Sequence, residues 1–179
     1  MISGTARGTV LRAPSTNEAR PISDRAKESL FNILGARVEG SSFLDLFAGT
    51  GGVGIEALSR GAASATFVER SAAIVADVRH NLARTRLADR ATVHHRDAFG
   101  YLKGPPAGFD IVFVAPPQWH EMWQEALRAL DAAPAWVADG GIVVVQHDPK
   151  EYEPLDLGAF AVCDNRRYGG VNLVFYARS

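Results

Sequence analysis

The stretch that decides the fold is a strand end that runs through a glycine-rich turn into a helix: Asp45-Leu46-Phe47-Ala48-Gly49-Thr50-Gly51-Gly52-Val53-Gly54. Gly49 and Gly51 allow a tight turn and let a ligand approach the backbone closely, because glycine has no side chain. Glu69 follows Gly49 by 20 residues, at the end of the next apolar segment, where its carboxylate can accept both hydroxyls of a ribose. This combination predicts a site for a nucleoside-containing cofactor. It leaves NAD and S-adenosylmethionine both open, because G-x-G-x-x-G is also the NAD fingerprint.

Short apolar segments recur along the chain, and several are apolar throughout, as strands buried on both faces are. We expect strands over residues 43–47, 65–69, 91–94, 110–114 and 142–146. Helical patterns lie between them, over residues 54–60, 71–86 and 122–130. Strand and helix therefore alternate, which predicts a doubly wound α/β fold with a mostly parallel sheet.

Both ends of the chain depart from this alternation. Residues 160–163 and 171–176 are joined by a segment with no room for a helix, which predicts a C-terminal antiparallel hairpin and brings the sheet to seven strands. Near the other end, Ser23 and Asp24 can cap a helix with an apolar stripe at Ala26, Leu30, Ile33 and Leu34. We expect residues 1–20 to form a short appendage, a small hairpin near the mouth of the fold.

Composition indicates one domain without metal or disulfide. The chain has 179 residues, of which 47% are hydrophobic and 22% charged, as is ordinary for a soluble domain. Cys163 is the single cysteine, and no Cys/His cluster offers ligands to a structural metal, which favours a reducing compartment and therefore the cytoplasm. The chain shows neither the apolar core of a signal peptide nor an apolar run long enough to span a membrane.

Charge is distributed unevenly. The net charge is −1, but residues 1–37 carry six Arg or Lys against three acidic residues. This segment can steer a phosphate backbone toward one edge of the molecule, and an ordinary solvated surface is the alternative explanation.

The motifs taken together resemble the class I S-adenosylmethionine-dependent methyltransferases. Their order is Asp45-x-Phe47-x-Gly49-x-Gly51, then Glu69, then Asp97-Ala98 after the third strand, and then a Pro-Pro turn after the fourth. More narrowly, residues 20–34, 44–51 and 54–62 resemble the bacterial family that methylates a guanine N2 of 16S ribosomal RNA. The similarity extends from Ser3-Gly4 to Tyr168-Gly169, so it covers nearly the whole chain.

This resemblance implies a cofactor, a substrate and a set of site residues. The cofactor is S-adenosylmethionine, and the substrate is ribosomal RNA, free or in a small-subunit assembly particle. Residues 38–179 are the methyltransferase domain, and residues 1–37, the extension and basic helix, belong to the same domain. The cofactor residues are those near the methionine part (Asp45, Phe47, Gly49, Gly51), the ribose (Glu69) and the adenine (Asp97, Ala98). The RNA-binding residues are Arg7, Arg20, Arg25 and Lys27.

The match fails at the turn expected to hold the methyl acceptor. The family has Asp-Pro-Pro-aromatic there, whereas this chain reads Ala115-Pro116-Pro117-Gln118, without the carboxylate and without the aromatic ring. Trp119 or His120 can restore stacking from a shifted position. Three readings stay open: catalysis with backbone acceptors at Ala115 and Pro116, an altered target such as a small molecule, and a silent homologue that binds cofactor or RNA. Methyl transfer is an in-line displacement governed by positioning, so no metal is expected.

Overall fold

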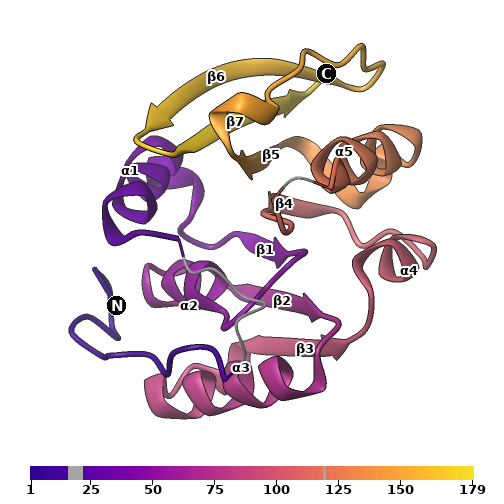
Figure 1. Ribbon diagram of the computed structural model, residues 1–179. Helices are drawn as coiled ribbons and strands as arrows, with labels where there is room; N and C mark the ends of the chain where they lie inside the picture. Colours follow the sequence, from indigo (N-terminus) through magenta and orange to yellow (C-terminus); the bar gives the residue numbers. More distant parts are fainter. Residues whose placement is uncertain (16–21, 119) are drawn as a thin grey trace.

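A seven-stranded sheet runs through the centre of the protein, with helices on both of its faces (Figure 1). The computed structural model describes residues 1–15, 22–118 and 120–179. The strands lie in the order β3-β2-β1-β4-β5-β7-β6. The first five strands along the chain pair in parallel, and β7 lies antiparallel between β5 and β6. The expected doubly wound, mostly parallel sheet with a C-terminal hairpin is confirmed.

The strands are β1 (Ser42–Asp45), β2 (Ser64–Glu69), β3 (Ala91–His95), β4 (Phe109–Val114), β5 (Val137–His147), β6 (Phe160–Tyr168) and β7 (Val171–Arg178). The helices are α1 (Asp24–Leu34), α2 (Gly52–Ser59), α3 (Ala72–Thr85), α4 (Ala98–Leu102) and α5 (Met122–Ala132). Short 3-10 turns lie at Gly35–Arg37, Ala88–Arg90, Pro134–Trp136 and Pro149–Glu151. None of the helices in the described part of the chain is long and apolar enough to cross a membrane.

Three expectations about the elements are wrong in detail. The hairpin turn is only Gly169 and Gly170, because β6 continues to Tyr168. Most of β6 is exposed, so its polar residues follow no apolar pattern that marks a strand. The short helix α4 was not expected, and residues 1–15 contain turns and no strand, so the small N-terminal hairpin is absent from this described segment.

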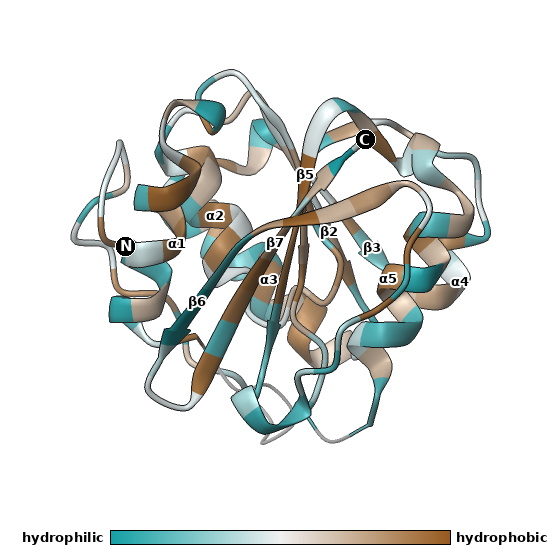
Figure 2. Cartoon of the chain, turned by 90° about the horizontal axis from the view of Figure 1, so that it is seen from above, coloured by the Kyte–Doolittle hydropathy of each residue, from teal (hydrophilic) through white to brown (hydrophobic). Residues whose placement is uncertain are grey.

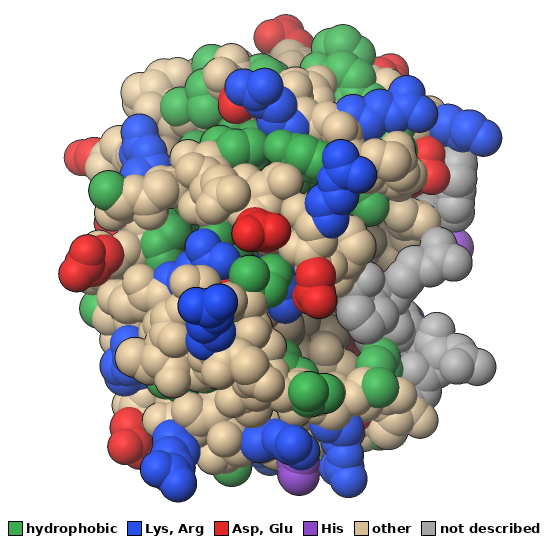
Figure 3. All heavy atoms as spheres, turned by 90° about the vertical axis from the view of Figure 1, so that its left-hand side faces the viewer, with side chains coloured by type: hydrophobic (Ala, Val, Ile, Leu, Met, Phe, Trp, Pro, Cys, Tyr) green, Lys and Arg blue, Asp and Glu red, His purple; other side chains and the backbone are tan. Residues whose placement is uncertain are grey.

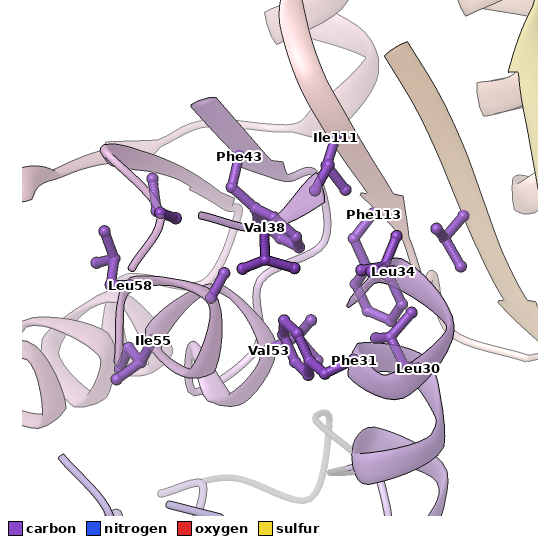
Figure 4. Packing of buried hydrophobic residues seen from close by; sticks show 14 of the residues in the cluster. Leu30, Phe31, Leu34, Val38, Phe43, Val53, Ile55, Leu58, Ile111 and Phe113 are labelled. Atoms are coloured by element: carbon purple, nitrogen blue, oxygen red, sulfur yellow. The ribbon is translucent and has the colours of Figure 1, made fainter. Parts of the chain in front are cut away.

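The core lies on both faces of the sheet because neighbouring residues of a strand point to opposite sides. On one face, Phe43 and Phe113 pack against apolar residues of α1 and α2, among them Phe31 and Val53 (Figure 4). On the other face, the alternate strand residues pack against α4 and α5. Figure 2 shows the result: the central strands β5 and β7 are largely brown, whereas the exposed end of the edge strand β6 is teal. The parallel strands are buried on both sides, as their apolar runs predicted.

Residues 1–15, here called the N-terminal strap, are fastened to α2 by buried polar side chains. The N–H groups of Ile2 and Ser3 donate to the Glu56 carboxylate at 3.0 and 2.9 Å. Ala6 N–H donates to Ser59 Oγ at 2.9 Å, and that hydroxyl donates in turn to the Ser3 carbonyl. Glu56 and Ser59 are buried, so these bonds satisfy groups that would otherwise be costly to bury.

The strap then continues along α3. Arg12 N–H donates to Asn81 Oδ1 at 2.7 Å, and Ser15 N–H donates to Asp77 Oδ2 at 2.9 Å. Asn81 Nδ2 donates to the carbonyls of Arg12 and Thr50 at 3.3 and 3.0 Å. Thr50 belongs to the glycine turn, so one buried side chain connects the strap to that turn.

Gly54 sets the distance between α2 and the sheet. A Cβ at this position would overlap Phe67 Cε1 on β2 and would lie 2.8 Å from its Cζ. Only glycine therefore fits here without a shift of the helix or of a buried ring.

Replacing Gly54 by Ala should destabilise the protein by about 1 to 3 kcal/mol, as overpacking of a filled core does. The matched control is Gly52→Ala in the same helix, where an added Cβ meets nothing within 4 Å. The control should leave the free energy of unfolding unchanged or raise it by up to about 1 kcal/mol, because Ala favours helix over Gly. Urea unfolding followed by circular dichroism measures both values. Equal values for the two variants would contradict the close packing of α2 on β2.

Candidate active site

The expected site residues meet at one edge of the sheet. Asp45 ends β1, Glu69 ends β2, and Ala115 directly follows β4, the strand on the other side of β1. These strands are parallel, so their carboxyl ends lie together. In open α/β sheets this is the edge at which ligands bind.

The glycine turn uses backbone conformations that favour glycine. Gly49 has a φ of +52° and Gly51 a φ of +82°, both in the left-handed region. Gly51 N–H donates to the Ala48 carbonyl at 2.8 Å, and Gly51 is the N-cap of α2 without a capping side chain. The helix N-terminus is thus left facing the edge where a cofactor is expected.

Glu69 holds the turn through backbone hydrogen bonds. Its Oε2 accepts from Gly49 N–H at 3.0 Å, and its Oε1 accepts from Ser71 N–H at 2.9 Å. Each carboxylate oxygen has a further lone pair, so both oxygens can still accept ribose hydroxyls. The two backbone donors fix the orientation of the carboxylate before any ligand arrives.

Asp45 is buried beneath the same turn and accepts a hydrogen bond from Gly54 N–H at 3.1 Å. Burial raises the pKa of Asp45 to about 7, the Gly54 N–H opposes this rise, and the negative charge of Glu69 adds to it. A carboxyl group with a pKa near neutrality gains its charge readily when a cation binds beside it.

Asp97 and Phe47 lie toward the β3 side of the site. Asp97 caps α4, with Oδ2 accepting from Gly100 N–H at 2.8 Å, and its side chain is exposed at the surface. Ala98 is buried behind it. Phe47 meets Phe99 edge to face, with ring centroids 6.1 Å apart. The sequence did not single out Phe99, although its position directly after Asp97-Ala98 was a usable signal.

The acceptor turn is only partly enclosed. Ala115 is half-buried and packs against the core on the α1 face of the sheet. Pro116 is buried, Pro117 is exposed and Gln118 is half-buried. Trp119 lies outside the described residues, and His120 is exposed.

Gln146 on β5 is a polar residue of this region that the sequence did not identify as functional. The parallel pairing of β4 and β5 sets Val114 opposite Val145, so the next residues, Ala115 and Gln146, are neighbours. Gln146 Oε1 is buried and has no hydrogen-bond partner in the described part of the chain. A lone polar residue at the end of the apolar run 142–145 was the available signal.

The residues expected to bind RNA differ in their surroundings. Arg7 and Arg25 are exposed. Lys27 is only 7% exposed, and its Nζ lies 3.7 Å from Asp24 Oδ1. Arg20 lies outside the described residues. No group of three His, Cys, Asp or Glu side chains within residues 1–15, 22–118 and 120–179 could hold a metal ion.

Known proteins that match most of this chain belong to one family. Residues 1–177 match the family described as conserved hypothetical protein 95. Ribosomal RNA small subunit methyltransferase D of Escherichia coli (strain K12) is 36% identical over 148 residues, which cover 83% of this chain and 74% of that protein.

Solved structures agree with the fold. The structure of yhhF from Escherichia coli has a TM-score of 0.88 and 34% identity, and the match covers 100% of this chain and 97% of that one. An RNA methyltransferase from Salinibacter ruber, solved with S-adenosyl-L-homocysteine, has a TM-score of 0.70 at 17% identity, with 89% and 94% covered. The resemblance to bacterial methyltransferases of small-subunit ribosomal RNA is thereby confirmed. The chain belongs to the conserved hypothetical protein 95 family, together with ribosomal RNA small subunit methyltransferase D of Escherichia coli.

Proposed function

We propose that this protein transfers the methyl group of S-adenosylmethionine to an exocyclic guanine N2 of small-subunit ribosomal RNA. The observation that carries the proposal is the glycine turn, held by Glu69 and Asp45 beside the Pro-Pro turn at one edge of the sheet. The relatives that match most of the chain support the RNA substrate.

The chemistry of the edge fits this cofactor. Asp45, Phe47, Gly49 and Gly51 would surround the methionine part, whose positive charge favours the charged form of Asp45. Glu69 would accept the ribose hydroxyls, and Asp97 beside Ala98 would accept from the adenine amino group through the oxygen that does not cap α4. When bound, the cofactor supplies a methyl group activated by its sulfonium. NAD would instead bring its negatively charged pyrophosphate to the glycine turn, beside the carboxyl of Asp45.

The protein's part in the reaction is to position the acceptor. A guanine amine is a weak nucleophile, because its lone pair is delocalised into the ring. The carbonyls of Ala115 and Pro116 can accept its hydrogens, and Pro117 restricts the backbone that presents them. The Gln118 amide can add a polar contact to a base taken out of the RNA stack.

RNA would approach along the N-terminal segment. Arg7, Arg20 and Arg25 are proposed to contact phosphates, while Lys27 would first have to leave Asp24. We also propose that residues 1–37 and 38–179 form one domain, since the strap and α1 pack on the body of the fold. A ribosomal RNA substrate would place the reaction in the cytoplasm.

Ala115 favours a second candidate, a homologue that binds the cofactor and RNA without catalysis. Here the acceptor carboxylate of the resembling family is lost. The first candidate remains the better supported one, because loss of one such hydrogen bond costs about 1 to 3 kcal/mol. A cost of this size slows methyl transfer without abolishing it.

Single-turnover assays with radiolabelled cofactor distinguish the two candidates. We expect the unmodified protein to methylate free small-subunit ribosomal RNA or small-subunit particles. Glu69→Ala is the negative control, because it removes the ribose acceptor and should weaken cofactor binding. Transfer by Ala115→Asp, with none by the unmodified protein on either substrate, would show that catalysis has been lost.

A further inference from the structure

Arginines are concentrated along one edge of the sheet. Residues 1–15 and 70–96 together carry eight Arg, no Lys and two acidic residues, whereas the rest of the chain has a net charge of −7. Arg7 and six further members of this group are exposed. The six, here called the basic edge, come from the strap, from α3 and from the ends of β2 and β3: Arg12, Arg70, Arg79, Arg84, Arg86 and Arg96.

The two segments are adjacent in space as well as alike in charge. Arg12 is bound to α3 through Asn81, and its guanidinium lies 3.7 Å from Asp77. In Figure 1, α3 and β3 form the lower edge of the molecule. Figure 3 shows Lys and Arg side chains gathered along this same lower edge.

Most of these guanidinium groups form no hydrogen bond or ion pair with the residues that the structure describes. Among the residues that the structure describes, Arg12 is the only arginine of the basic edge that forms an ion pair. Arg90 differs, because it donates to the carbonyls of Ala62 and Leu58 and so supports the fold. Arg84 and Arg86 lie near the C-terminus of α3 and can interact with its dipole, but Arg70, Arg79 and Arg96 have no such explanation.

The basic edge begins at the cofactor site. Arg70 follows Glu69, and Arg96 precedes Asp97. From there the charges continue along α3, whose 14 residues extend over about 21 Å. An extended array of this size can contact several phosphates of one nucleic-acid backbone.

We propose that the basic edge binds the phosphate backbone of the RNA that flanks the target nucleotide. The inference rests on the proposed function, since it assumes an RNA substrate. The exclusive use of Arg supports it, because the planar guanidinium donates two hydrogen bonds to one phosphate, which a Lys ammonium cannot match. A membrane surface fits less well, since no Leu, Ile, Phe or Trp of the described residues is among the exposed large hydrophobic side chains.

The test compares two variants of equal charge change. The edge variant is Arg79→Gln/Arg84→Gln/Arg86→Gln, and the control is Arg128→Gln/Arg166→Gln/Arg167→Gln, three exposed arginines on α5 and β6, away from this edge. Affinity for a 16S ribosomal RNA fragment is measured between about 50 and 200 mM salt. The edge variant should bind more weakly, and its slope of log K against log salt should be shallower by about 2 to 3. The control should keep the parental slope.

The outcomes separate the two proposals. If the edge variant keeps the parental salt slope, or if the control loses as much RNA affinity as the edge variant does, the basic edge is not the phosphate-binding surface. The proposal that the protein acts on RNA is unaffected by either result. Absence of RNA binding by the unmodified protein overturns the proposed function and this inference together. Binding to phosphatidylglycerol vesicles in place of RNA would assign the edge to a lipid surface and overturn the inference.

A separate observation concerns the acceptor turn. Gln146 and Ala115 are neighbours on adjacent strands, and both follow residues that point to the α4 and α5 face, so both lie on the α1 face. The buried, unpartnered Oε1 of Gln146 is an acceptor beside the position where the carboxylate is missing. An unsatisfied buried acceptor is costly, which is typical of a group kept for a ligand.

The geometry points to Gln146 as the side-chain acceptor for one hydrogen of the target amine. In the step itself, the amine nitrogen forms the new N–C bond while the S–C bond breaks and its electron pair stays on sulfur. The amine proton leaves to water. Gln146 accepts a hydrogen bond and takes no proton. This inference also assumes the proposed methyl transfer.

Gln146→Leu tests this role. We expect the single-turnover rate at saturating cofactor to fall about tenfold or more, a loss of about 1.4 kcal/mol. Cofactor affinity should not change, and the thermal midpoint should not fall, because the variant removes a buried unsatisfied acceptor. Ala115→Asp added to Gln146→Leu should restore the rate by supplying an acceptor next to it. An unchanged rate in Gln146→Leu, or a loss of rate that only follows a lower thermal midpoint, overturns the assignment. An inactive unmodified protein overturns the proposed function instead.

Discussion

Two carboxylates hold the glycine turn, and the rest of the site depends on this arrangement. Glu69 accepts from Gly49 N–H, and Asp45 accepts from Gly54 N–H, so the turn is fixed at both of its ends. The turn can pass this close to the sheet because Gly54 has no side chain to meet Phe67. These two hydrogen bonds and the close packing of Gly54 on Phe67 therefore set the shape of the proposed cofactor site and the position of α2. They also keep the two acidic groups near each other.

The N-terminal strap extends this constraint to the surface. Asn81 donates to the carbonyls of both Arg12 and Thr50, which joins the strap to the glycine turn through one buried amide. Glu56 and Ser59 fasten its first residues to α2. RNA bound along the basic edge would thus contact a segment that is hydrogen-bonded to the proposed cofactor site.

The parallel strands and the glycine turn were predictable because local signals report them directly. Strands buried on both faces are apolar throughout, and a tight turn with positive φ requires Gly49 and Gly51. The full length of β6 was not predictable, since an exposed edge strand follows no apolar pattern. The hydrogen bonds that anchor the strap and the role of Gln146 were missed for another reason. Their roles depend on contacts between residues far apart in sequence, such as Arg12 with Asn81, which composition and periodicity do not report.

Calorimetric titration of the protein with S-adenosylmethionine and with NAD tests the account of the cofactor edge most directly. Because its pKa is about 7, Asp45 is partly protonated in the free protein near neutral pH, and a bound cation would favour its charged form. We expect S-adenosylmethionine to bind more tightly as the pH rises through about 7, with proton release on binding, and we expect Asp45→Asn to lose this pH dependence. NAD should give no binding signal. Tight binding of NAD without any signal from S-adenosylmethionine would contradict the account.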